Sequence, residues 1–148
     1  MQLIKLFDEE NVGFDFQAAD KNDALEKLSK LVCKNRPFLN YEKVLDVLIE
    51  REKLGSTGIG NEVAIPHGKM NIDESLVGAI AISKTGVEFE SIDKQPVRII
   101  IVLIASKQAT HLHLKILAKI SRFLMDDNFR EKLKNIKSFS ELKNILPE

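Results

Sequence analysis

The chain has 148 residues, 44% of them hydrophobic and 30% charged, with 22 Lys and Arg residues against 22 Asp and Glu residues. This length predicts one domain over residues 1–148, and the apolar content excludes an intrinsically disordered chain. The balanced charge argues against nucleic acid as the main partner, and a single cysteine excludes a disulfide framework and a cysteine-rich metal site.

No segment predicts a membrane span or a secretion signal. The longest apolar run covers residues 99–105, far short of the roughly 18 apolar residues that a spanning helix needs. The first ten residues have no sustained apolar stretch and turn acidic, unlike a signal peptide. We therefore expect a cytoplasmic protein with no direct membrane insertion.

The first third of the chain predicts a short strand and two amphipathic helices. Residues 12–16 alternate apolar and polar side chains, as a strand does. Asp20 is a suitable N-cap for a helix whose apolar positions recur three and four residues apart up to Val32. Asn40 is a suitable N-cap for a second helix, which we expect to end at Gly55.

The rest of the chain predicts several strands and then three helices. The expected strands cover residues 63–65, 76–83 and 97–105, with 87–89 as a further short candidate. Residues 97–105 are apolar at almost every position, which is typical of a central strand that is buried on both faces.

The predicted C-terminal helices cover about residues 111–125, 128–136 and 139–145, with Thr110 and Ser138 as N-caps and Glu141 completing a capping box. The charged residues 130–143 are expected to form a solvated helical face. The order of elements predicts an α/β fold, in which a mixed β-sheet is sandwiched between helices in three layers.

Residues 55–61 contain three glycines, which allow backbone N–H groups to converge on an anion. Ser56 and Thr57 add hydroxyl donors, and Arg51 and Lys69 bracket the segment with positive charge. These residue types are the ones that phosphoryl chemistry uses.

His67 follows this segment, between Pro66 and Gly68. Because proline fixes its own φ and glycine can adopt a positive φ, we expect His67 to lie at a bend with a rigid backbone, as suits a nucleophile. On the pattern alone, a tight connection with a surface histidine remains an equal alternative.

Two common phosphate motifs do not fit the segment. A Walker A loop requires lysine after its second glycine, where Asn61 stands. A dinucleotide-binding fingerprint requires glycine or alanine where Val63 stands, and a strand where the chain predicts a helix.

The sequence Ser-Thr-Gly-Ile-Gly-Asn at residues 56–61, followed by Val-Ala-Ile-Pro-His-Gly at 63–68, resembles the active-site signature of enzyme IIA domains of the fructose–mannitol type in the bacterial phosphotransferase system. Residues 110–114, Thr-His-Leu-His-Leu, match a second stretch in which that family carries histidine. The resemblance covers nearly the whole chain. It implies the fold of that family and a phosphotransferase component that works through a phosphohistidine, with no cofactor and no metal.

The resemblance also implies roles for individual residues. His67 would accept the phosphoryl group from the histidine-containing phosphocarrier protein, His111 would be the second active-site histidine, and Arg51 would bind phosphate. The other expected phosphate-binding residues are Ser56, Thr57, Gly58, Gly60 and Asn61. Glu62 departs from the pattern, because relatives often have glycine there. Its carboxylate would either change only the local charge of the loop or, if it lies beside the site, weaken the docking of an acidic partner or the retention of phosphate.

Helical spacing separates the two histidines of the second stretch. His113 shares an apolar face with Leu117 and Ile120, which favours a hydrogen-bonded helper or a core histidine, whereas His111 lies on a charged face. Cys33 lies mid-helix, which favours a buried and inert thiol. The chain would then be a IIA unit and not the cysteine-phosphorylated IIB unit.

Two functions follow from the resemblance. One is a nitrogen-regulatory enzyme IIA, a free-standing regulator that binds target proteins according to its phosphorylation state, and this is the one we favour. The other is a sugar-specific IIA that passes phosphate to a fructose- or mannitol-type IIB. A degenerate relative that is never phosphorylated is disfavoured by the intact His67.

Overall fold

The computed structural model describes residues 2–147 and arranges them around a six-stranded mixed sheet. The strands, in their order across the sheet, are β1 (Val12–Gly13), β5 (Leu76–Val87), β6 (Val97–Ser106), β3 (Val63–Ala64) and β2 (Gly58–Gly60), while β4 (His67–Met70) also pairs with β6. β5 and β6 are antiparallel, as are β2 and β3, whereas β1 runs parallel to β5 and both β3 and β4 run parallel to β6. The helices are η1 (Leu3–Leu6), η2 (Glu9–Asn11), α1 (Lys21–Cys33), α2 (Tyr41–Lys53), α3 (Thr110–Leu124), α4 (Asp127–Lys134) and α5 (Phe139–Ile145).

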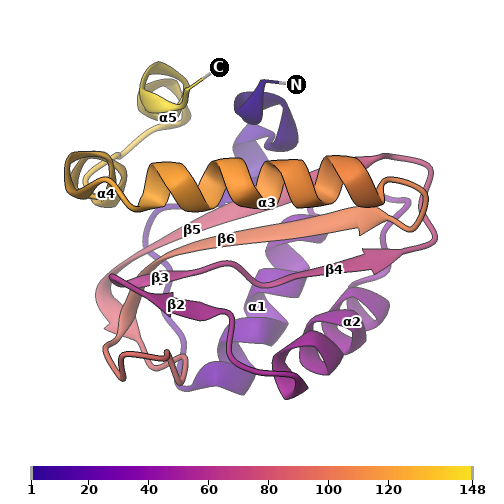
Figure 1. Ribbon diagram of the computed structural model, residues 1–148, viewed down its shortest axis with the longest axis horizontal. Coiled ribbons are helices and arrows are strands. Elements are labelled where there is room, and N and C mark those ends of the chain that lie inside the picture. The colour runs from indigo at the N-terminus through magenta and orange to yellow at the C-terminus, as the bar shows by residue number, and fades with distance from the viewer. Residues whose placement is uncertain (1, 148) are drawn as a thin grey trace.

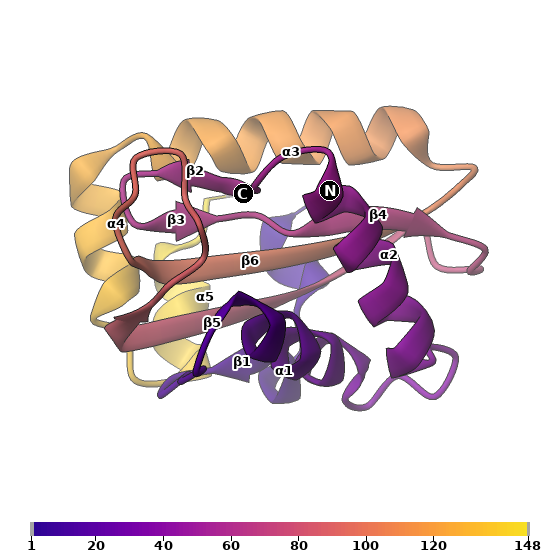
Figure 2. The ribbon, with the colours of Figure 1, turned by 90° about the horizontal axis from the view of Figure 1, so that it is seen from below.

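Helices cover both faces of this sheet, which confirms the predicted three-layer α/β/α fold. Successive side chains of β6 alternate, so that Ile101 and Leu103 point to one face and Val102 and Ile104 to the other. The first face packs against η1, α3, α4 and α5, and the second packs against α1 and α2. Figures 1 and 2 show α3 on one side of the sheet and α1 on the other. As predicted, β6 is central and buried on both faces.

Most of the predicted helix starts are confirmed. Asp20, Asn40 and Ser138 each accept a hydrogen bond from the backbone N–H three residues ahead, over distances of 2.8, 3.1 and 3.1 Å. Thr110 was the wrong cap for α3, because it is already the first helical residue. Its hydroxyl oxygen instead accepts a hydrogen bond from Lys69 Nζ at 3.2 Å.

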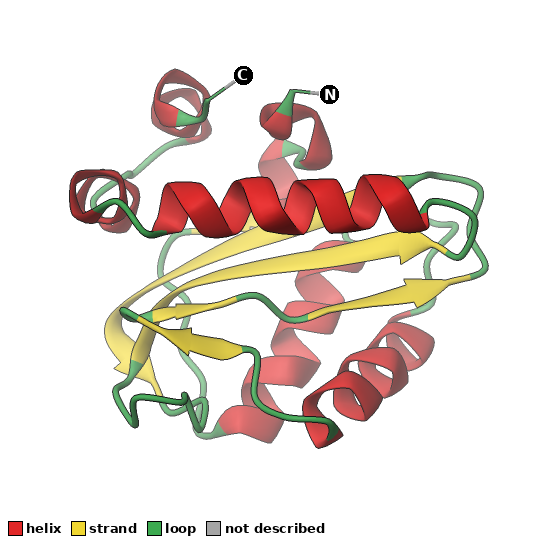
Figure 3. Ribbon diagram, viewed as in Figure 1, coloured by secondary structure: helices red, strands yellow, loops and turns green. Residues whose placement is uncertain are grey.

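Two strand expectations were wrong. Residues 87–89 form no separate strand, because Val87 ends β5 and Phe89 is buried in the loop that follows. The glycine-rich segment, in which no strand was predicted, contributes β2, which pairs with β3 in a short hairpin (Figure 3). Glycine is required there, because a Cβ on Gly58 would lie 2.9 Å from the Cα of Ser91.

His67 stands in a strand and not at a bend. β3 and β4 lie end to end along the same edge of β6 and keep one register, with Val63 opposite Ile99 and His67 opposite Leu103. Pro66 separates the two strands because it has no N–H to donate to the ladder.

Among residues 2–147, no helix is long and apolar enough to cross a bilayer.

α2 packs directly on the backbone of β4. A Cβ on Gly68 would lie 2.2 Å from Val47 Cγ1, so the absence of a side chain at residue 68 allows the helix to approach. α2 ends next to the glycine-rich segment, and this contact therefore fixes the distance between that segment and His67.

The substitution Gly68→Ala should lower the free energy of unfolding by about 1–3 kcal/mol, because a valine in a helix strongly prefers one χ1 rotamer and Val47 would have to leave it or shift to avoid the new methyl group. Urea denaturation measures the change. Val47→Ala introduced into the Gly68→Ala protein should restore part of the loss, since it removes the obstructing atom. Wild-type stability of the Gly68→Ala protein would contradict this packing.

Candidate functional site

The site is built where β4 meets α3. Side chains alternate along β4, so that His67 points to the face covered by α3 while Gly68 points to α2. The His67 ring lies against the His113 ring of α3, with a centroid distance of 5.4 Å and an interplanar angle of 74°. Two histidines 46 positions apart in the chain thus form one pair.

The tautomer of His67 is set by the backbone. His67 Nδ1 lies 2.7 Å from the carbonyl oxygen of Ile65. Because a carbonyl oxygen can only accept, Nδ1 carries the proton in the neutral ring, and Nε2 has a free lone pair. Burial lowers the pKa of His67, and the positive charge of Arg51 lowers it further, against the opposing effects of the Ile65 hydrogen bond and Glu52. The ring is therefore neutral, with Nε2 available as a nucleophile, near neutral pH.

His113 is the buried member of the pair. Only 3% of its surface is exposed, and neither ring nitrogen hydrogen-bonds to another described residue. Burial, and then the proximity of His67 and Lys69, lowers its pKa to about 4. His113 is therefore a neutral ring with an unused N–H donor beside the nucleophile.

His111 is not brought to this pair. It lies on the exposed side of α3, and the structure gives it no hydrogen bond, ion pair or ring contact with the other described residues. Two residues along a helix differ by about 200° in direction, so His111 and His113 face opposite ways. Helical spacing predicted the directions of both side chains correctly, and the residue to which the resemblance gave the second active-site role, His111, is the exposed one.

Two cations flank the histidine pair. Arg51 lies in the last turn of α2, and its Nη1 donates to the carbonyl oxygen of Gly55 at 2.9 Å. Lys69, two residues after His67 on the same face of β4, reaches Thr110 at the start of α3. Both positive charges are close enough to the pair to act on it, because Arg51 lowers the pKa of His67 and Lys69 lowers that of His113.

The donors of Ser56 and Thr57 are already engaged. Ser56 Oγ donates to the carbonyl oxygen of Phe89 at 3.1 Å and accepts from the N–H of Gly58 at 3.1 Å. Thr57 is buried, and both its N–H and its hydroxyl donate to the Glu52 carboxylate. These groups hold the segment in place.

Gly60 and Asn61 lie at the far end of the β2–β3 hairpin, roughly 13 Å along the strand direction from His67. Gly60 adopts a φ of +95°, and the N–H of Asn61 donates to Asp93 Oδ2 at 3.1 Å. The structure thus separates these two predicted phosphate ligands from the histidine pair.

Glu62 also lies at the hairpin tip and not beside the histidine pair, which favours the alternative of a local effect on the charge of the loop. It forms ion pairs with Arg98 at 2.5 Å and with Lys134 of α4 at 2.9 Å. Its φ of +67° favours glycine, which is a physical reason for glycine to be frequent at this position in relatives.

Sequence reasoning missed Glu52 and Lys21. Glu52 is the residue after Arg51 on α2, and Lys21 opens α1; their side chains are 2.9 Å apart. In the sequence, each of them is only one charged residue of an amphipathic helix, and helical spacing does not indicate which residue such a charge contacts.

Cys33 is the last residue of α1 and not a mid-helix residue. It is partly buried, and burial raises the pKa of its thiol, which keeps the sulfur protonated and a poor nucleophile.

Among residues 2–147, no three His, Cys, Asp or Glu side chains lie close enough together to hold a metal ion.

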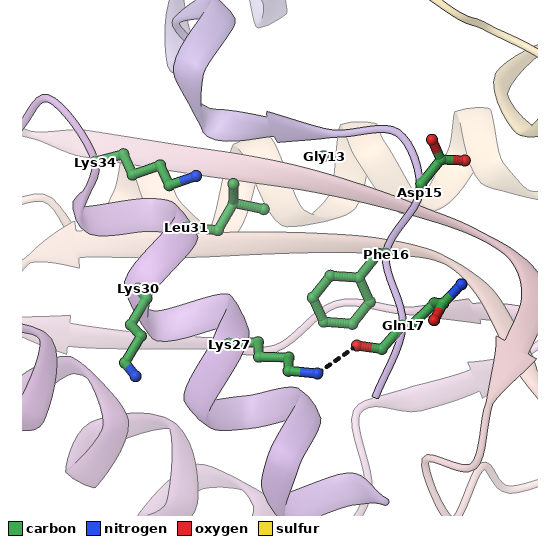
Figure 4. Close-up of a pocket in the computed structure, with 8 residues that line it drawn as sticks. All are labelled: Gly13, Asp15, Phe16, Gln17, Lys27, Lys30, Leu31 and Lys34. Carbon is green, nitrogen blue, oxygen red and sulfur yellow. Dashed lines mark hydrogen bonds between the residues drawn. The ribbon is translucent and has the colours of Figure 1, made fainter. Parts of the chain in front are cut away.

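A separate pocket of about 430 Å³ lies between the loop after β1 and α1, with Phe16 and Leu31 as its apolar lining (Figure 4). Lysines 27, 30 and 34 stand around it, but Lys27 donates to the carbonyl oxygen of Gln17 at 2.9 Å and pairs with Asp23 at 3.1 Å. No histidine lines this pocket, which sets it apart from the candidate site.

The buried His113 should make the protein sensitive to acid. Its pKa is lower in the folded chain than in the unfolded chain, so the unfolded state binds the proton first and stability falls as the pH drops from about 6.5 toward 4. The loss reaches at most about 3 kcal/mol. His113→Leu should flatten this part of the pH dependence in urea denaturation, whereas the matched variant His111→Leu should not. Equal slopes in both variants would refute the effect.

The chain was compared with known proteins. A family model described as "Phosphoenolpyruvate-dependent sugar phosphotransferase system, EIIA 2" matches residues 5–148. A nitrogen regulatory protein of Bradyrhizobium diazoefficiens is 40% identical over 127 residues, which cover 84% of this chain and 83% of that protein. A fructose-specific EIIA component of Haloferax volcanii is 30% identical over 139 residues, which cover 94% of this chain and 90% of that protein.

The fold has a close match among solved structures as well. The crystal structure of the nitrogen regulatory protein IIA-Ntr from Neisseria meningitidis matches with a TM-score of 0.90 and 30% identity, over 98% of this chain and 99% of that chain. Family model, curated relatives and solved structure agree with the signature at residues 56–68. This chain belongs to the EIIA 2 family of the phosphoenolpyruvate-dependent sugar phosphotransferase system.

Proposed function

We propose that this protein is a cytoplasmic phosphoryl carrier, which accepts a phosphoryl group on His67 from the phosphohistidine of the histidine-containing phosphocarrier protein. The observation that supports this most directly is the His67 ring itself. Its Nδ1 is held by the Ile65 carbonyl, and its Nε2 is unprotonated, next to the buried His113. Family membership supports a phosphotransfer component in general.

The transfer exchanges one phosphorus–nitrogen bond for another. The Nε2 lone pair of His67 attacks the phosphorus atom while the bond to the donor histidine breaks, and the donor nitrogen recovers its electron pair. The Nδ1 proton of His67 stays in place, and the Ile65 carbonyl stabilises the positive charge that the ring acquires. Since bonds of the same kind form and break, the step needs no nucleotide and no metal.

Three groups would stabilise the phosphoryl oxygens. Arg51 and Lys69 supply positive charge close to the histidine pair, and the N–H of His113 supplies a buried donor. We therefore assign the role of second active-site histidine to His113 in place of His111.

The glycine-rich segment supports the site in this proposal. The hydroxyl and N–H groups of Ser56 and Thr57 already have partners, and Gly58 makes the close approach to Ser91 possible. Direct phosphate contacts by these residues, or by Gly60 and Asn61, would require rearrangement of the hairpin.

The nitrogen-regulatory function is the one we favour, because a relative at 40% identity and a solved structure at 30% identity both carry that name. In this function the phosphorylation state of His67 would decide which target proteins bind. A sugar-specific carrier that delivers phosphate to a IIB component is the second candidate, which the fructose-specific relative supports.

Incubation with phosphoenolpyruvate, enzyme I and the phosphocarrier should add about 80 Da, the mass of one phosphoryl group, to the intact protein as an acid-labile adduct. Mass spectrometry measures it, and His67→Ala should abolish it because the accepting Nε2 atom is lost. Continued uptake by His67→Ala, or no uptake by the wild-type protein, would refute the proposal.

The two histidines of α3 provide a matched pair for the same assay. His113→Ala should slow uptake by roughly 10²-fold, the effect typical of removing one transition-state donor. His111→Ala should leave the rate within about twofold, because its ring is exposed and turned away. The reverse order of effects would return the role to His111.

The two functions differ in what happens to the phosphoryl group afterwards. When the phosphorylated protein is mixed with a fructose- or mannitol-type IIB, the regulatory function predicts that the label stays on His67, because no transfer partner is required. Radiolabelled phosphate followed on a denaturing gel measures this. Rapid appearance of the label on IIB, accompanied by sugar uptake in a strain that lacks its own IIA, would favour the sugar-specific function.

A further inference from the structure

We propose that Glu52, clamped by Lys21, is a positioning residue for phosphoryl transfer, because a continuous series of hydrogen bonds connects its carboxylate to the His67 ring. This inference rests on the proposed function, since it concerns the same histidine. It adds a residue from outside the histidine pair, and it assigns a task to a buried ion pair that the transfer chemistry leaves unused.

The Glu52 carboxylate is held on three sides. Oε1 accepts from the N–H of Thr57 at 2.9 Å and lies 2.9 Å from Lys21 Nζ, and Oε2 accepts from the Thr57 hydroxyl. Only 6% of the Glu52 side chain is exposed, compared with 14% of Lys21. A buried carboxylate with this many partners is rigid, and the removal of any partner is costly.

Thr57 passes this constraint to the strand that carries the nucleophile. Its carbonyl oxygen accepts from the N–H of Ile65 at 3.0 Å, and the carbonyl oxygen of Ile65 in turn accepts from Nδ1 of His67 at 2.7 Å. The order of contacts is therefore Lys21, Glu52, Thr57, Ile65 and His67. Movement of Thr57 would move the carbonyl group that fixes both the tautomer and the direction of the His67 ring.

Lys21 extends the same cluster to the other helix. Its Nζ lies 3.5 Å from Ser56 Oγ and 4.9 Å from the centre of the Phe89 ring, so it ties the start of α1 to the segment that follows α2. It also neutralises Glu52. An unpaired carboxylate at this place would repel a phosphoryl group on His67, since Glu52 is close enough to His67 to affect its protonation.

The isosteric variant Glu52→Gln distinguishes an effect of the Glu52 charge on the transfer rate from an effect of the hydrogen bonds that Glu52 accepts. If Glu52 acted through its negative charge alone, loss of that charge would favour an anionic phosphoryl group and speed the transfer. If it acts by position, the amide cannot accept both hydrogen bonds from Thr57 and pair with Lys21, and the transfer slows. The sign of the rate change therefore separates the two roles.

The experiment measures single-turnover phosphoryl uptake at saturating phosphocarrier, together with ¹⁵N NMR of the His67 ring in the unphosphorylated protein. Glu52→Gln should slow uptake about tenfold, as expected for a misplaced nucleophile, and should shift the Nδ1 and Nε2 signals toward a mixture of tautomers. Saturating donor removes any effect on docking. Glu50→Gln is the matched control and should change neither quantity, because Glu50 is an exposed residue of the same helix whose ion-pair partner is Lys53.

A second pair of variants covers the case in which Glu52→Gln does not fold. Thr57→Val deletes the hydroxyl donor while keeping the shape and the backbone N–H, and it should reproduce the changed ring signals to a smaller extent. Thr57→Ser keeps the donor and should restore wild-type values.

Unchanged or faster uptake by Glu52→Gln would overturn the inference, and so would slower uptake with unaltered His67 ring signals. Failure of the wild-type protein to take up phosphate would refute the proposed function and leave the ring signals to decide on Glu52. Shifted signals would then support the positioning role, and unchanged signals would overturn it.

Discussion

The candidate site depends on one backbone constraint, which is that residues 63–70 lie in a single register along the edge of β6. Because side chains alternate along an extended chain, this register decides which residue meets which helix. It turns His67 toward α3 and Gly68 toward α2. A shift by one residue would exchange the two, placing a glycine before His113 and a histidine where no Cβ fits.

Pro66 interrupts the hydrogen-bond ladder along this edge. It lies between β3 and β4 in the same register, but has no N–H to donate. Neither backbone group of its neighbour Ile65 bonds to β6 in these contacts. The Ile65 N–H donates to the carbonyl oxygen of Thr57, and the Ile65 carbonyl oxygen accepts from the His67 ring. An interrupted ladder therefore supplies the acceptor that selects the tautomer of His67.

Burial then sets the electrostatics of the site. The two histidines are neutral because desolvation disfavours their charged forms, and each cation nearby adds to that effect. The carboxylate of Glu52 in the same neighbourhood is paired with Lys21 and accepts hydrogen bonds from Thr57. A neutral nucleophile, flanking cations and a compensated anion together suit repeated gain and loss of a phosphoryl group.

Local pattern predicted much of the fold. The caps at Asp20 and Asn40, the central strand and the three layers depend on residues close together in sequence, and they were confirmed. The strand nature of residues 58–60 was missed, because three glycines in seven residues have little strand propensity. Only the close approach to Ser91 makes a glycine necessary there.

By itself, the sequence determined that His67 is the central residue of a phosphotransferase signature, because the informative residues are contiguous. It also determined that His113 belongs to the buried face of its helix, because apolar spacing depends on helical geometry alone. Only the tertiary structure decided that this buried face meets β4, so that His113 and not His111 touches His67. It also decided that Glu52 holds Thr57. The physical reason is that these contacts join elements distant in the chain, and their partners are fixed by the packing of helices on the sheet.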